Sequence, residues 1–86
     1  MSDLEQLKQA LYQVASSAQQ TAGGLGDFKQ NFSQHSAQIE SLISGTSTGA
    51  DRQLVELLDG ATKAIEAAAQ ALDAASSGCT SYADQI

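Results

Sequence analysis

Residues 54–86 read LVELLDGATKAIEAAAQALDAASSGCTSYADQI, and this stretch decides the fold class. Its apolar residues recur at alternating intervals of four and three, running from Leu54 through Leu58, Ile65 and Leu72 to Tyr82, with alanine or cysteine at the positions between them. This spacing is the heptad repeat of a helix that packs along one stripe. We therefore predict an amphipathic helix over residues 51–84.

The first half of the chain carries the same repeat. From Leu4 to Leu42 the apolar residues are again spaced by three and four, and the register continues across Gly23, Gly24 and Gly26 without a slip. A loop would usually reset that register, so we predict one continuous helix over residues 3–43. Ser2 followed three residues later by Glu5 has the form of a capping box and marks its start.

The segment between the two repeats is a predicted turn. Residues 44–50 are Ser, Gly, Thr, Ser, Thr, Gly and Ala, and we assign the turn itself to Ile43, Ser44, Gly45 and Gly49. A connection this short forces the two helices to lie antiparallel. The predicted fold is therefore all-α, a single domain over residues 1–86 that forms a coiled-coil-like antiparallel two-helix hairpin.

The larger apolar residues of the two repeats form the predicted seam between the helices. Pairing Leu42 with Leu54 or Val55 sets the register and brings Phe28 near Ala68. The residues that we expect to hold the seam are Leu11, Val14, Leu25, Phe28, Phe32, Ile39, Leu42, Leu54, Leu58, Ile65, Leu72 and Tyr82.

A hairpin of this composition has a thin core, because 15 of its hydrophobic residues are alanine and only four of its 86 residues are Phe or Tyr. Chains below about 70 to 80 residues usually need disulfides, a metal or association to be stable, and this chain is only slightly longer. Since alanine lets helices approach closely, we expect the hairpin to dimerise into a four-helix bundle. The predicted partner-binding face consists of Ala15, Ala22, Val55, Leu57, Ala64, Ala67, Ala71 and Ala74.

The charge balance narrows the range of partners. Four Lys plus Arg against ten Asp plus Glu give a net charge of −6, which repels nucleic acid and disfavours an anionic membrane surface. No stretch approaches the roughly 20 apolar residues that span a bilayer, and the acidic N-terminal segment does not resemble a secretory signal. We therefore expect the protein to be cytoplasmic or secreted by a route that needs no signal peptide.

Residues that carry chemistry are few and scattered. The predicted register holds His35 and Cys79 far apart, and no His, Cys or acidic residues have the spacing of a metal site. We predict no catalytic residues, no metal and no cofactor, and so no enzyme. His35 is read as a partly exposed side chain, or alternatively as a switch whose protonation places a charge in the seam. Cys79 is read as a small buried hydrophobe, or alternatively as a site of oxidation between chains.

A hairpin under 100 residues with a glycine-containing turn resembles the WXG superfamily of small helical-hairpin proteins of type VII secretion. Ile43-Ser44-Gly45 stands where that family has Trp-x-Gly. The family's export tail has a Tyr followed four residues later by an acid, whereas here Tyr82 is followed at that distance by Ile86. The resemblance covers nearly the whole chain, which also resembles helical hairpins that accompany polymorphic toxins.

The resemblance implies a non-enzymatic hairpin that binds itself or a paralogous hairpin, and that acts as a type VII substrate or as a targeting partner of a larger effector or toxin, or of a secretion component. The alternative is a cytosolic helical adaptor or small structural protein unrelated to secretion. A third reading, an amphipathic binder of membrane surfaces, is disfavoured by the scarcity of Lys and Arg.

Overall fold

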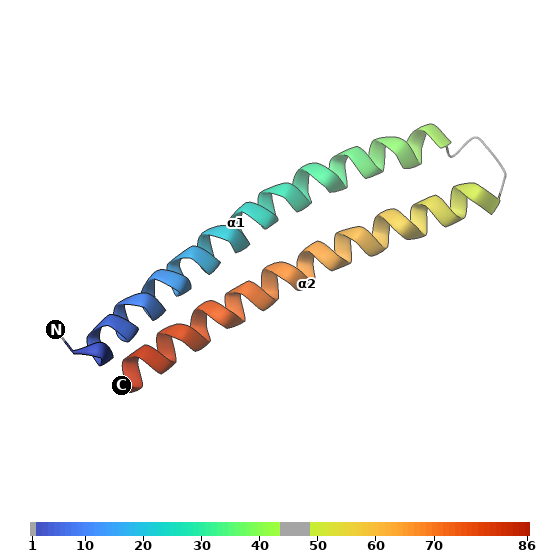
Figure 1. The fold of residues 1–86 in the computed structure, drawn as a ribbon. Helices are drawn as coiled ribbons and strands as arrows, with labels where there is room; N and C mark the ends of the chain where they lie inside the picture. The colour runs from blue at the N-terminus through green and yellow to red at the C-terminus, as the bar shows by residue number, and fades with distance from the viewer. Residues whose placement is uncertain (1, 44–48) are drawn as a thin grey trace.

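The computed structural model describes residues 2–43 and 49–86, which form two long helices. Helix α1 spans Asp3–Ile43 and helix α2 spans Gly49–Gln85. The two helices run antiparallel along their whole length, with both chain ends at the same end of the rod (Figure 1). The described residues contain no strand, so the prediction of an all-α helical hairpin is confirmed.

Helix α1 begins at a side-chain cap and runs on without a break. The amide of Glu5 donates a hydrogen bond of 3.2 Å to Ser2 Oγ, which gives a partner to one of the amides left over at the helix start. Gly23, Gly24 and Gly26 all lie within the helix, and no described residue has a positive φ. The prediction of one continuous first helix is therefore confirmed.

The helix boundaries follow the predicted ones closely. Helix α1 ends at Ile43, and helix α2 begins at Gly49, two residues before the predicted start. Gly49 is thus the first residue of α2, whereas the sequence placed it in the turn; assignments of helix ends commonly differ by one or two residues. Ser44 and Gly45, the centre of the predicted turn, lie outside the described residues.

Two contacts between the helices define how they are aligned. Lys29 Nζ lies 2.5 Å from Glu66 Oε1, and the Tyr12 hydroxyl donates a hydrogen bond to Asp84 Oδ1. From the first pair to the second, α1 moves back 17 residues while α2 moves forward 18, as expected of two antiparallel helices in constant register. The result is a rod measuring 66 × 18 × 14 Å.

The seam of the hairpin is the strip along which the two helices pack. It consists of residues that are buried or half-buried and that recur every three or four positions. On α1 these are Lys8, Leu11, Ala15, Ala18, Ala22, Leu25, Lys29, Phe32, Ser36, Glu40 and Ile43, and on α2 they are Asp51, Val55, Leu58, Thr62, Ile65, Ala69, Leu72, Ser76, Cys79, Ala83 and Ile86.

This seam corrects part of the predicted one. Ala15 and Ala22, predicted to bind a partner, are only 5% and 7% exposed because they pack between the helices, and Val55, also assigned to a partner, is half-buried there. Conversely, several residues predicted for the seam are exposed: Val14, Phe28, Ile39, Leu42, Leu54 and Tyr82.

The physical reason for the correction is the width of the apolar stripe on each helix. A stripe three rows wide contains two heptad seams that differ by a rotation of about 50° about the helix axis, and periodicity alone does not choose between them. On α1 the structure selects the seam that carries more alanine. Small side chains let two helices approach closely, so the bulkier row of α1 is left on one side of the hairpin.

Candidate partner-binding face

One side of the hairpin exposes an apolar row from each helix. On α1 the large members are Leu7, Val14, Phe28 and Leu42, at multiples of seven, and three of them are more than half exposed: Val14 by 53%, Phe28 by 56% and Leu42 by 81%. On α2 the row runs from Leu54 to Tyr82 at intervals of seven. We call the two rows together the apolar face: Leu7, Val14, Thr21, Phe28, His35 and Leu42 with Leu54, Ala61, Ala68, Ala75 and Tyr82.

The helical repeat places both rows on the same side of the hairpin. On α1 the members from Leu7 to Phe28 each precede a seam residue by four positions, as Phe28 precedes Phe32, and each α2 member does the same, as Ala68 precedes Leu72. A step of four residues rotates about 40° beyond a full turn. Viewed from the N-terminus of its own helix, each row is rotated away from the seam in the same direction. Because the two helices are antiparallel, these equal rotations bring the two rows to the same side of the hairpin.

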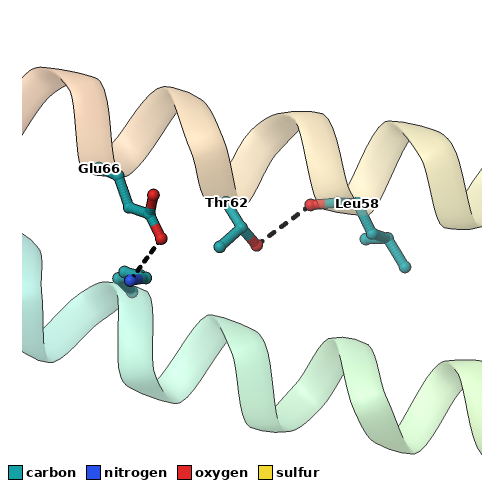
Figure 2. Close-up of polar contacts among 4 residues, drawn as sticks. Leu58, Thr62 and Glu66 are labelled. Carbon is teal, nitrogen blue, oxygen red and sulfur yellow. Dashed lines mark hydrogen bonds and ion pairs between the residues drawn. The ribbon is translucent and has the colours of Figure 1, made fainter.

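The opposite side of the hairpin carries the polar contacts, and we call it the polar edge. Tyr12 and Glu66 each follow a seam residue by four positions, which is the opposite displacement. The Tyr12–Asp84 hydrogen bond and the Lys29–Glu66 ion pair both lie here. Figure 2 shows Glu66 reaching across to the facing helix on this side, one turn along α2 from Thr62.

Hydrogen bonds also bind the seam itself. Ser76 Oγ donates to the carbonyl oxygen of Ala15 at 2.8 Å, a direct bond between the helices. Thr62 Oγ1 donates to the carbonyl of Leu58 at 3.2 Å within α2 (Figure 2), so its polar atom is satisfied locally. Ser36 Oγ is buried in the seam without a hydrogen-bond partner among the described residues. The seam is thus partly polar, which limits how much the monomer gains from closing it.

The apolar face is free of charge along its whole length. None of its members is Asp, Glu, Lys or Arg, although the chain holds 14 such residues. All are exposed except Ala61, which is half-buried. Isolated exposed apolar residues are ordinary on a protein surface, but a continuous uncharged apolar strip marks an interaction site.

The residues predicted for the partner face are distributed over three sides of the hairpin. Ala15, Ala22 and Val55 lie in the seam, as described above. Leu57, Ala64 and Ala71 are exposed in the row that borders the apolar face, with Leu57 exposed by 71%. Ala67 and Ala74 are exposed on the side of α2 turned away from α1, because each lies two residues, or about 200°, from its neighbours in the seam. The signal that identifies the face is the absence of charge, rather than the abundance of alanine.

The remaining residues that were predicted for the seam do lie in it. Leu11, Leu25 and Phe32 of α1 are half-buried, and so are their counterparts Leu58, Ile65 and Leu72 of α2. Phe32 also stacks on Phe28, with ring centroids 6.2 Å apart and an interplanar angle of 19°. Phe28 therefore belongs to the apolar face while resting on a residue of the seam.

The side chains that could carry chemistry are not brought together. His35 is exposed on the apolar face near the turn end of the rod, whereas Cys79 is half-buried in the seam toward the other end. Within residues 2–43 and 49–86 no three His, Cys, Asp or Glu side chains are grouped so as to hold a metal ion. Nor does any segment of the described helices have the length and hydropathy to cross a bilayer.

The polar edge also holds a perturbed ionisable group. The hydrogen bond to Asp84, with the negative charge of that carboxylate, raises the pKa of the Tyr12 phenol above its usual value. Sequence reasoning missed this pair. The predicted register could have identified the Tyr12–Asp84 pair, because a register that sets Val14 near Tyr82 also sets Tyr12 level with Asp84.

Comparisons with known proteins do not add to this picture. The chain matches no protein-family model, and comparisons with curated proteins and with solved structures return no significant match.

Proposed function

We propose that this chain is a non-enzymatic helical hairpin whose function is to bind a second helical hairpin through the apolar face. A single observation carries the proposal: uncharged apolar rows from both helices lie exposed on one side, along the whole rod. The cross-helix ion pair and the Tyr12–Asp84 bond, by contrast, lie on the other side.

The energetics of the isolated hairpin support the same proposal. Among the described residues only Ala15, Ala22, Ala83 and Ser36 are classed as buried, and no large side chain is fully buried. Burial of apolar surface contributes about 25 cal/mol per Å², so most of the stabilisation available to Phe28, Leu42 and Leu57 is unused in the monomer. A partner that covered these side chains would supply it.

The kind of partner follows from the shape of the face. It is long, straight and made of two parallel ridges of helical side chains, so it fits another pair of helices better than a globular ligand or a small molecule. Its lack of charge gives no basis for binding nucleic acid or an anionic membrane. We therefore assign it to helix-on-helix docking.

The narrower biological role that we propose is that of a WXG-like type VII secretion substrate or targeting partner of a larger effector. Support comes from the hairpin architecture and from the sequence Ile43-Ser44-Gly45, whose first residue ends α1. The alternative is a cytosolic adaptor of the same shape. It is favoured by the aliphatic Ile43 in place of the family's Trp, and by Ile86 where the export tail has an acid.

A matched pair of variants tests whether the apolar face binds a partner. Ala68 lies on the face, and its neighbour Ala67 lies on the side of α2 turned away from α1; both are exposed. Light scattering on the chain, alone and mixed with helical hairpins encoded by adjacent genes, should show a complex that A68E abolishes and A67E preserves. A chain that remains monomeric in every mixture would contradict the proposed function. Proteomics of the culture fluid separates the secretion role from the adaptor role.

A further inference from the structure

We propose that the partner covering the apolar face is a second copy of this chain, related by a two-fold axis that runs along the length of the rod. In this arrangement α1 of each copy lies over α2 of the other, and the turns of both hairpins are at the same end. The inference rests on the proposed function and specifies its partner and its geometry.

The exposed area of the hairpin matches what such a dimer needs. The chain exposes 6092 Å², whereas a compact monomeric protein of 8.9 kDa exposes about 4,800 Å². The excess of about 1,300 Å² exceeds the roughly 800 Å² that each partner contributes to a stable interface. A second rod laid lengthwise on the apolar face would hide surface of this size without lengthening the 66 Å particle.

The two rows of the face complement each other in size. The α1 row presents large side chains such as Val14, Phe28 and Leu42, while the central members of the α2 row are alanines at 61, 68 and 75. A large row packs well against a small one, because protruding side chains then fill the space that the alanines leave open. One hairpin therefore carries both halves of a self-complementary surface, as an isologous dimer requires.

The register of the hairpin determines which residues meet in this dimer. The Lys29–Glu66 pair sets Phe28 level with the stretch that contains Ala68. A two-fold axis along the rod keeps every residue at its own level, so Phe28 of one copy comes to lie over Ala68 of the other. By the same rule His35 lies over Ala61, Thr21 over Ala75, and Leu42 and Val14 over Leu54 and Tyr82 near the two ends of the interface. The pairing of large with small side chains is thus confined to the central Phe28–Ala68 and His35–Ala61 levels.

The other face-to-face arrangement fits the rows poorly. A two-fold axis across the rod would lay α1 on α1 and α2 on α2, with the turns at opposite ends. The large rows would then hold the α1 helices apart while the alanine rows demanded a closer approach of the α2 helices. The seam and the Ser76–Ala15 bond hold α1 and α2 of each hairpin together, so the two hairpins can stack at only one spacing. The spacing that the large α1 rows require would leave a gap between the alanine rows of α2.

The charges of the chain allow two copies to meet on this face. Each copy carries a net charge of −6, which opposes self-association in general. The apolar face holds none of the Asp, Glu, Lys or Arg residues, so the dimer would bury no unpaired charge there and its acidic side chains would stay on the outer surfaces.

Two measurements test the inference. The first is sedimentation equilibrium on the purified chain and on the A68E and A67E variants, with helicity followed by circular dichroism. The wild type and A67E should be dimers, and A68E should shift toward monomer by at least tenfold in dissociation constant. A wild-type monomer, or a dimer that A68E leaves intact, would overturn the inference. A monomer that forms a one-to-one complex with a neighbouring hairpin would overturn it while leaving the proposed function in place.

The second measurement determines the arrangement and does not depend on whether A68E folds. Gln6 is exposed on the side of α1 turned away from α2, near the end opposite the turn. A spin label on Gln6→Cys in a Cys79→Ser background, which removes the only native cysteine, reports one distance between copies. We expect it to be well below the 66 Å length of the rod, because both labels are at the same end. A distance close to that length would place the turns at opposite ends and overturn the proposed axis.

Discussion

Tyr12, near the start of α1, donates a hydrogen bond to Asp84, two residues from the end of the chain, and so joins its two ends on the polar edge. Together with the Lys29–Glu66 pair, this bond forms the polar edge on one side of the hairpin. The apolar face occupies the other side. The hairpin is therefore two-sided: one side is polar and bonded within the chain, and the other is uncharged and unpartnered in the monomer.

The ionisation of Tyr12 should depend on Asp84. The carboxylate stabilises the neutral phenol, so the pKa of Tyr12 is raised in the folded protein. The stability that this bond contributes is therefore present below the pKa of Tyr12 in the unfolded chain, and it is lost as the pH rises through the pKa of Tyr12 in the folded protein. In a Tyr82→Phe background Tyr12 is the only tyrosine, and its titration can be followed by ultraviolet absorbance. Asp84→Asn should lower the pKa of Tyr12 toward its usual value, whereas Asp73→Asn, a change at another exposed carboxylate of α2, should not. Equal titration curves for both variants would show that the bond does not form in solution.

The glycines of α1 should be replaceable with a gain in stability. A Cβ added at Gly23 or Gly26 would meet no atom within 4 Å, and neither residue has a positive φ. Since glycine inside a helix costs about 0.5 to 1 kcal/mol relative to alanine, Gly23→Ala and Gly26→Ala should each raise the free energy of unfolding by about that amount. Urea denaturation measures the change, and Ala67→Gly on α2 should shift the midpoint in the opposite direction. A loss of stability in the alanine variants would mean that something approaches these glycines closely in the native protein.

Enlarging Ala15 should separate the two candidate seams. Ala15 is 5% exposed, and its carbonyl accepts the bond from Ser76, so the helices pass close together at this point. Ala15→Leu should cost about 1 to 3 kcal/mol of unfolding free energy, because the larger side chain forces the helices apart. Ala10→Leu, at an exposed position of the same helix, is the control and should cost little. If Ala15→Leu were as stable as the wild type, the seam would lie along the row of Val14 and Phe28 instead.

The sequence was sufficient to predict the two helices, because heptad spacing extends over each of them and neither proline nor a change of register interrupts it. It was not sufficient to predict which row of the apolar stripe faces the other helix. That choice depends on how closely Ala15, Ala22 and Ala83 let the helices approach and on bonds such as Ser76 to Ala15, which a periodic pattern does not contain. Ala15, Ala22 and Val55 were wrongly predicted to bind a partner for the same reason, since a shift of the seam by one row moves flanking residues to a new side.

Replacing His35 should strengthen the dimer that we propose. His35 is exposed in the middle of an otherwise largely apolar row, one heptad from both Phe28 and Leu42. In the proposed arrangement each copy buries this imidazole against Ala61 of the other, at the cost of desolvating a polar group. His35→Leu would replace that cost with apolar burial at two symmetric places, and because a buried leucine contributes about 1.5 kcal/mol or more, the dissociation constant should fall by at least about tenfold. Gln34→Leu makes a similar change on the side of α1 turned away from α2 and controls for the general effect of an added leucine. Sedimentation equilibrium gives both constants; equal affinities for the two variants would show that His35 is not in the interface.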